Sequence, residues 1–239
     1  MSNENPTPAF LFERLLATST SHRDRWQAAD QIRRLSRDAI PDLVVALDAP
    51  ERALQQVAAE ALQAIGPPAR VATRPLLRLL TSDSWSVRAH AAAALRSLSP
   101  RLGRYVPLLI AQLAREDDVR VRWSLIGLIG MAGRAARSAV PILARERDCD
   151  QEALAAWAAI DPADSDLHSR LRCGLADRVN ARARWNAAGL LGRIALADPE
   201  LLQALEVATT DRDAHVRHAA REAIARIERR GLRRAVTPG

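Results

Sequence analysis

The stretch SVRAHAAAALRSL at residues 86–98 decides the fold, because the chain repeats its pattern. It returns at 215–227 as HVRHAAREAIARI, which shares Val-Arg, a central Ala and the apolar positions that follow. Five further stretches fit the same frame: DRWQAADQIRRL (24–35), LQQVAAEALQAI (54–65), VRWSLIGLIGMA (121–132), CDQEALAAWAAI (149–160) and ARWNAAGLLGRI (183–194). The aligned centres are Ala28, Ala58, Ala91, Leu125, Ala153, Ala187 and Ala220. Their spacing of 28 to 34 residues is the period of a two-helix repeat.

Short apolar segments between these copies complete each repeat. Most begin with a proline, namely Pro41, Pro75, Pro107 or Pro141. Proline is tolerated in the first turn of a helix, where its missing N–H would have no partner. Each repeat is therefore predicted to pair a proline-led outer helix with an Ala-rich inner helix. Neither helix can bury its apolar face alone, so the sequence predicts an all-α superhelix of about seven stacked helix pairs.

The composition agrees with an all-helical repeat protein. Of the 239 residues 48% are hydrophobic but only 3% aromatic, so the core is built from Ala, Leu, Ile and Val. We expect one repeat domain over residues 1–239, with frayed ends at 1–8 and 231–239. All 35 basic residues are Arg, which is typical of a GC-rich bacterial genome. They are dispersed among 28 acidic residues, so the net charge of +7 predicts only weak, unspecific binding of nucleic acid.

The sequence predicts a cytoplasmic protein without a membrane partner. The start MSNENPTPAFLFERLL lacks the basic and apolar regions of a signal peptide, and no window approaches 18 uninterrupted apolar residues. Cys149 and Cys173 form no CxxC pair and lie in Ala-rich helical sequence, so they are expected to be reduced core thiols.

The frame resembles the HEAT-like, armadillo-type repeat family found in phycobilisome lyase proteins and many bacterial scaffolds. The family pattern D-x-x-V-R-x-x-A-A-x-A-L is matched by DSWSVRAHAAAAL (83–95) and DRDAHVRHAAREAI (211–224). The resemblance spans roughly residues 20–228. It implies a ladder of bonds between adjacent repeats, made here by Arg25, Arg88, Arg122, Arg184 and Arg217. Gln55 and Asp150 interrupt this ladder, so the second and fifth repeats are expected to stack less regularly.

Helical periodicity places a set of Trp and Gly residues opposite the core. Counting about 100° per residue from Val87, the core stripe contains Ala91 and Leu95, whereas Ala89 falls on the opposite face. Trp occupies the Ala89 position in three other repeats, and Gly occupies the two following positions on the same face in two of them. The set is Trp26, Trp123, Trp185, Gly127, Gly130, Gly189 and Gly192. Trp157 in the core stripe and Trp85 at a helix start are assigned to packing.

Two interpretations of this face stay open. Each Trp could lie flat over its own Gly pair and cover a bare helix. Alternatively, Gly lets a ligand approach the backbone while Trp supplies a flat apolar contact, which the sequence favours because exposed Trp is costly. The second interpretation predicts a groove with Trp123 and Trp185 as opposing walls. Its occupant would be a protein segment, a peptide or an apolar or aromatic small molecule.

The sequence offers little chemistry beyond binding. It contains no Gly-rich phosphate loop and no recognisable nucleophile motif, so no cofactor is expected. His215, His218 and Glu222 have metal-like spacing but no complete ligand set, and no metal is predicted. HEAT-like alkylpurine DNA glycosylases place an Asp one turn after a groove Trp, which here only Asp30 after Trp26 does, with Arg33 on the same face. A glycosylase-type DNA-binding protein and a phycobilin-lyase-like accessory enzyme are therefore alternatives to a bacterial binding or scaffold protein without catalysis.

Overall fold

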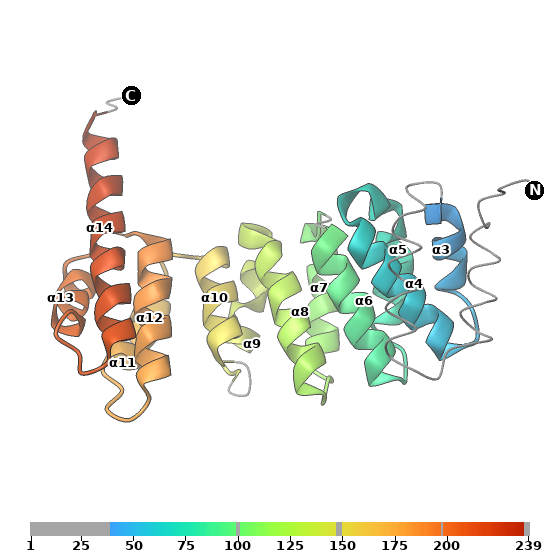
Figure 1. Ribbon diagram of the computed structural model, residues 1–239, viewed down its shortest axis with the longest axis horizontal. Coiled ribbons are helices and arrows are strands. Elements are labelled where there is room, and N and C mark those ends of the chain that lie inside the picture. The colour runs from blue at the N-terminus through green and yellow to red at the C-terminus, as the bar shows by residue number, and fades with distance from the viewer. Residues whose placement is uncertain (1–38, 99–100, 147–149, 197, 237–239) are drawn as a thin grey trace, which may run out of the picture. The chain divides into compact units, whose positions relative to one another are not determined.

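The computed structural model describes residues 39–98, 101–146, 150–196 and 198–236, and every regular element in these ranges is helical (Figure 1). The contacts within the chain divide it into two compact units, Met1–Ala132 and Gly133–Gly239. The all-α fold predicted from the repeat is confirmed, whereas the expectation of a single domain stays a prediction. Within the described ranges, no helix has both the length and the apolar character needed to cross a bilayer.

The first unit contains alternating outer and inner helices in its described part. The outer helices are α3 (Ile40–Ala46), α5 (Thr73–Leu79) and α7 (Val106–Leu113), and the inner helices are α4 (Arg52–Ile65), α6 (Trp85–Leu98) and α8 (Val119–Met131). Two 3₁₀ turns, η2 (Pro67–Ala72) and η3 (Gly103–Tyr105), lead into α5 and α7. The inner helices α4, α6 and α8 lie side by side in chain order.

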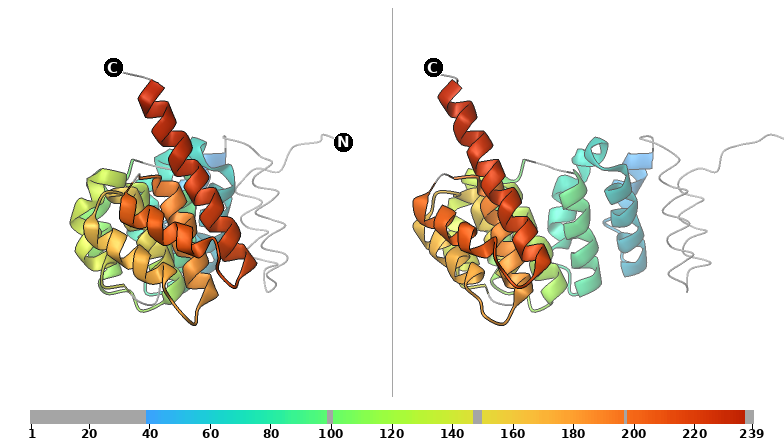
Figure 2. Two further views of the ribbon diagram at one scale, coloured as in Figure 1. Left: turned by 90° about the vertical axis from the view of Figure 1, so that its left-hand side faces the viewer. Right: turned by 60° about the vertical axis from the view of Figure 1, so that its left-hand side comes forward.

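The second unit continues the same alternation. The 3₁₀ turn η4 (Gly133–Ala139) precedes the outer helix α9 (Val140–Leu143), and the other outer helices are α11 (Ser165–Leu175) and α13 (Pro199–Ala208). The inner helices are α10 (Asp150–Ile160), α12 (Ala181–Ile194) and α14 (Ala214–Val236). Figure 2 shows that α14, the longest helix of this unit, projects past α12 and α13.

Short polar side chains and prolines set where the helices begin. Asp118, Asp164 and Asp198 each accept hydrogen bonds from two backbone N–H groups in the first turn of α8, α11 and α13. Asn180 accepts one such bond at the start of α12. These caps satisfy backbone donors that the helix itself leaves unpaired. Proline occupies the first turn of α3, α7, α9 and α13, as its fixed φ favours.

The repeat frame found in the sequence coincides with the buried core. Its described centres are all at most 3% exposed, namely Ala58, Ala91, Leu125, Ala153, Ala187 and Ala220. Small Ala side chains at these positions let neighbouring inner helices approach closely, while Leu from the outer helices fills the remaining space. Leu43, Leu76 and Leu109 of α3, α5 and α7 are fully buried in this way.

The arginines at the described ladder positions bind backbone carbonyls within their own repeats, and Arg88 and Arg184 also bind the following repeat. Arg88 donates through Nη1 to the carbonyl of Ser82 at 2.7 Å, and Arg122 and Arg217 donate likewise to residues six positions earlier, at 2.6 and 2.7 Å. Gln55, which replaces Arg, makes the equivalent bond to the carbonyl of Ala49 at 2.8 Å. Gln55 therefore retains the bond within its own repeat. Arg25 lies outside the described residues.

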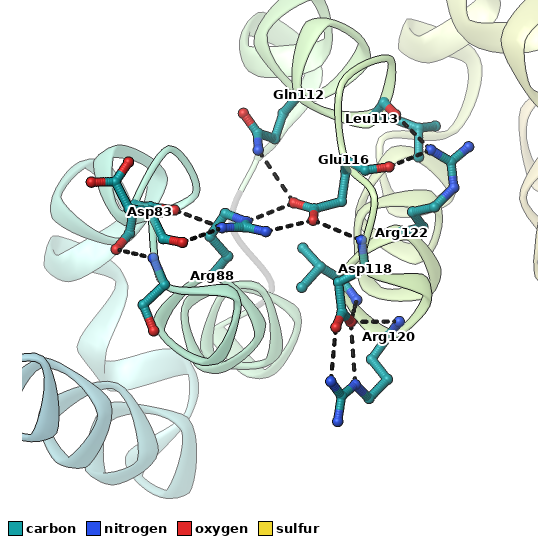
Figure 3. Close-up of polar contacts among 11 residues, drawn as sticks. Asp83, Arg88, Gln112, Leu113, Glu116, Asp118, Arg120 and Arg122 are labelled. Atoms are coloured by element: carbon teal, nitrogen blue, oxygen red, sulfur yellow. Dashed lines mark hydrogen bonds and ion pairs between the residues drawn. The ribbon is translucent and has the colours of Figure 1, made fainter.

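The guanidinium groups of two ladder arginines, Arg88 and Arg184, each bind a carboxylate of the following repeat. Arg88 donates through Nε and Nη2 to both oxygens of Glu116, each at 2.7 Å (Figure 3). Arg184 does the same to Asp211 at 2.7 and 2.9 Å. Burial raises the pKa of Glu116, but hydrogen bonds from Arg88 and the Asp118 backbone outweigh burial and hold the pKa below its ordinary value. The Arg184 hydrogen bond likewise lowers the pKa of Asp211.

Candidate binding groove

The exposed tryptophans lie on the inner-helix face that the periodicity predicted. Trp123 on α8 and Trp185 on α12 are each 46% exposed, although the next frame positions, Leu125 and Ala187, are buried. His218 of α14 occupies the same frame position and is exposed as well. The rings therefore lie outside the packed stripe. Trp26, the third tryptophan of this set, lies outside the described residues, as do Asp30 and Arg33 of the glycosylase alternative.

A cavity of about 500 Å³ lies beside Trp185 in the second unit. The inner helices α10, α12 and α14 form its walls. Its lining includes Glu152 and Ala155 of α10, Trp185, Asn186, Gly189 and Arg193 of α12, and His218, Glu222 and Arg226 of α14. We call this set the α12 groove. Its volume falls in the range of small-ligand and side-chain pockets.

The two glycines of α12 serve different purposes. A Cβ added at Gly189 would meet nothing within 4 Å, so Gly189 leaves open space in the α12 groove. A Cβ added at Gly192 would come within 2.9 Å of the Cα of Ala223, and Gly192 is buried. Gly192 therefore lines the α12 groove but leaves no open space for a side chain. Its missing side chain lets α12 and α14 approach each other.

The sequence grouped Trp123, Gly127 and Gly130 with the α12 set, but none of the three is among the described residues that line the α12 groove. Both glycines are half-buried on α8. The guanidinium of Arg96, on α6, lies over the ring of Trp123, with its carbon 4.4 Å from the ring centroid. This arrangement is a cation–π contact. Of the predicted set, the groove brings together Trp185, Gly189 and Gly192.

Charged residues of the α12 groove were only partly anticipated. The sequence singled out His218 and Glu222, for a metal, but not Arg226, which completes a row at four-residue spacing on α14. Arg226 donates to Glu222 at 3.3 Å, and His218 Nε2 lies 4.0 Å from a Glu222 oxygen. The spacing of this row is visible in the sequence. Glu152 and Arg193 carry no comparable signal, because their place in the groove depends on how α10 packs beside α12.

Other singled-out residues divide between core and surface. Trp157 is 2% exposed, which confirms its assignment to packing. Trp85 was also assigned to packing, but it is 45% exposed with the guanidinium carbon of Arg120 3.6 Å from its ring centroid. Cys173 was expected in the core and is instead an exposed free thiol on α11. It faces a second cavity of about 590 Å³ between α10, α11 and α12. Cys149 lies outside the described residues.

Comparison with known proteins places the chain by its fold. A family model of HEAT repeats matches residues 8–96, whose described part runs from α3 into α6. The structure of the complex of CpcE and CpcF of phycocyanin lyase from Nostoc sp. PCC7120 is 21% identical, with a TM-score of 0.55 over 95% of this chain and 97% of that one. An engineered protein is 20% identical, with a TM-score of 0.60 over 92% of this chain and 68% of that one.

A third similar structure, Kap121p bound to Ste12p, is 18% identical with a TM-score of 0.58. The likeness covers 83% of this chain but 24% of that much longer one. The search of curated proteins found no match to the sequence. At these identities the likeness to solved structures is one of fold. The recurring Ala-rich frame, the stacked helix pairs and the match of the HEAT-repeat model over residues 8–96 together give this chain a HEAT-like helical-repeat fold.

Proposed function

We propose that this helical-repeat protein is a binding protein that holds a segment of a partner polypeptide in the α12 groove. The observation that carries the proposal is the pairing of Trp185, 46% exposed, with Gly189, where a side chain would meet nothing within 4 Å. A large exposed ring beside a bare stretch of helix offers apolar contact and room for an incoming side chain. Such aromatic anchors dominate the energetics of many protein interfaces.

The chemistry of the lining favours a peptide over a purely apolar small molecule. Besides Trp185, the groove presents carboxylates from Glu152 and Glu222, guanidinium groups from Arg193 and Arg226, and the amide of Asn186. Groups of both charges and an amide can bind the backbone and polar side chains of a polypeptide, whereas a flat hydrocarbon offers them no hydrogen-bonding group. Glu152 and Glu222 would repel the phosphates of a nucleic acid.

The fold supports the same proposal by analogy. Kap121p, which shares this helical-repeat architecture, has Ste12p bound in its solved structure. Solenoids of this kind expose a long row of inner helices, and each repeat can contribute one contact to an extended partner. In the described part of the second unit Trp185 has no arginine against its ring, whereas in the first unit Arg96 lies over the ring of Trp123.

The test is to select random peptides displayed on phage against the full chain and to titrate the selected sequences. We expect peptides whose affinity falls about tenfold or more on Trp185→Ala, as for an aromatic anchor. Trp85→Ala is the matched control, because Trp85 is similarly exposed but lies in the first unit. Unchanged melting of both variants would show that the ring contributes to binding and not to folding. Equal loss on both substitutions, or none on Trp185→Ala, would contradict the proposal.

A further inference from the structure

The two exposed tryptophans in the described part of the first unit, Trp85 and Trp123, each have an arginine of the chain against the ring. The guanidinium carbon of Arg96 lies 4.4 Å from the ring centroid of Trp123, and that of Arg120 lies 3.6 Å from the ring centroid of Trp85. Both distances fall within the reach of cation–π attraction, about 6 Å. In each case a guanidinium of the chain lies against one face of the ring, which stays about half exposed.

Trp185 occupies the same repeat position as Trp123 but lacks the corresponding arginine. Arg96 lies 27 residues before Trp123, and the residue 27 positions before Trp185 is Ala158. Arg96 and Ala158 each lie five residues after the centre of their repeat, and Trp123 and Trp185 each lie two residues before the centre of the next repeat. Among the described residues, no cation lies over the ring of Trp185. Ala158 is half-buried on α10, and its methyl group cannot extend to the ring as Arg96 does.

Two acidic residues line the α12 groove together with Trp185. Glu152 comes from α10 and Glu222 from α14, the two inner helices that flank α12 (Figure 1). Arg193 and Arg226 follow Gly189 and Glu222 by four residues, about one helical turn, and the guanidinium of Arg226 donates back to Glu222 at 3.3 Å. The groove therefore contains a carboxylate from each neighbouring inner helix, and one of them, Glu222, also accepts a hydrogen bond from Arg226.

We infer that the partner segment of the proposed function places an arginine side chain over Trp185. Its guanidinium takes the role that Arg96 has over Trp123, and its aliphatic stem lies over the bare helix at Gly189. Glu152 and Glu222 supply the counter-charges. This inference rests on the proposed function, since it names the chemistry of the segment that the same groove holds. The chain as a whole carries a net charge of +7, so attraction of a basic segment must come from this local arrangement.

The test uses two fluorescein-labelled peptides of alternating Ala and Arg that differ only in that one has citrulline in place of every Arg. Citrulline keeps the shape of arginine and removes its charge. Fluorescence polarisation against the full chain should show the Arg peptide binding about five- to tenfold more tightly, the range of a partly desolvated cation–π contact. Trp185→Ala should abolish this preference, and Glu222→Gln should reduce it.

Ala158→Arg provides a second test, because it places on α10 the arginine that the repeat lacks. The new guanidinium should cover Trp185 from within the chain and remove the preference for the Arg peptide. Ala158→Gln, a matched change without charge, should keep the preference. Circular dichroism and melting of the two variants check that both fold alike. If both misfold, the Trp185→Ala and Glu222→Gln titrations decide the inference.

Equal affinities for the Arg and citrulline peptides would overturn the inference, as would a preference that survives Trp185→Ala. The phage selection tests the proposed function independently of the inference about arginine. If phage selection yields Trp185-dependent peptides without arginine, the groove binds polypeptide but the inference is wrong. If no selected peptide depends on Trp185, the proposed function itself fails.

Discussion

Gly192 of α12 lies against the backbone of Ala223 of α14, so that a Cβ at Gly192 would come within 2.9 Å of the Ala223 Cα. Gly189, one turn earlier, has no such neighbour within 4 Å. The two glycines look equivalent in the sequence, since each follows Trp185 on the same helix face. Gly192 therefore serves the packing of α12 against α14, whereas Gly189 leaves open space in the groove.

This difference predicts opposite effects of alanine at the two positions. Gly189→Ala should raise the free energy of unfolding by up to about 1 kcal/mol, because Ala favours a helix and the added Cβ meets open space. Gly192→Ala should lower the free energy of unfolding, because α12 and α14 must separate to admit the methyl group. Urea unfolding followed by circular dichroism measures both. A destabilised Gly189→Ala variant, or a stabilised Gly192→Ala variant, would contradict the assignment.

Burial predicts that the ion pair Arg88–Glu116 contributes far more than the pair Arg78–Asp48. The Glu116 side chain is fully buried, whereas Arg78 and Asp48 are 60% and 61% exposed. Glu116→Gln removes the counter-charge of Arg88 and should cost about 3 kcal/mol of stability, as for a broken buried pair. Asp48→Asn should cost less than about 1 kcal/mol, as for a surface pair. Similar losses in the two variants, measured by urea unfolding, would refute this account of the ladder.

The lowered pKa of Asp211 predicts loss of stability in acid. Its carboxylate is held ionised by Arg184, so its folded pKa lies below the unfolded value of about 3.9. Below that value the unfolded chain binds the proton more readily, and the contribution of this pair is lost as the pH falls through the folded pKa. It is fully present at neutral pH. Asp211→Asn should therefore show a shallower decline of stability below about pH 4 than the parent chain. Parallel pH profiles would argue against this linkage.

The end of α12 contains the only non-glycine residue with positive φ in the described ranges, Ala195, at φ 47° and ψ 45°. This left-handed conformation strains a side chain with a Cβ, and glycine relieves the strain. Ala195→Gly should raise the melting temperature, with a net gain of about 0.5 kcal/mol after the entropy of the unfolded chain is counted. Ala176, which ends α11 at φ −84°, is the matched control. Ala176→Gly should leave stability unchanged or lower it.

The sequence predicted the fold because the repeat frame encodes burial directly. The centre of each described copy, such as Ala91 or Leu125, is buried in the core, and the ladder arginines follow from their fixed place before these centres. Gln55 shows the limit of this reasoning. Its amide still reaches the Ala49 carbonyl, because a hydrogen bond within a repeat needs only a donor of sufficient length. The expectation that the second repeat stacks less regularly stays a prediction, since this bond does not join two repeats.

The sequence predicted which helix face the groove residues occupy, but not how much open space lies in front of each of them. Periodicity placed Trp185, Gly189 and Gly192 opposite the core, but the distance between α12 and α14 decides which glycine is open, and no pattern in one helix encodes that distance. Arg96 over Trp123 was missed for a similar reason. The contact joins two repeats. Aligning the repeats shows which residues share a position, but not which residue of one repeat lies against a residue of the next.

The most direct test of the binding account is calorimetric titration of a phage-selected peptide into two variants of one residue, Gly189→Ala and Gly189→Leu. Both add a side chain at the same point of α12 and both favour the helix, so each should fold at least as stably as the parent. The account predicts that Gly189→Ala retains most of the affinity, since a methyl group leaves the space above it open. Gly189→Leu should lose about tenfold or more, because its side chain fills the space beside Trp185. A folded Gly189→Leu variant that binds the peptide as tightly as the parent chain would contradict the account.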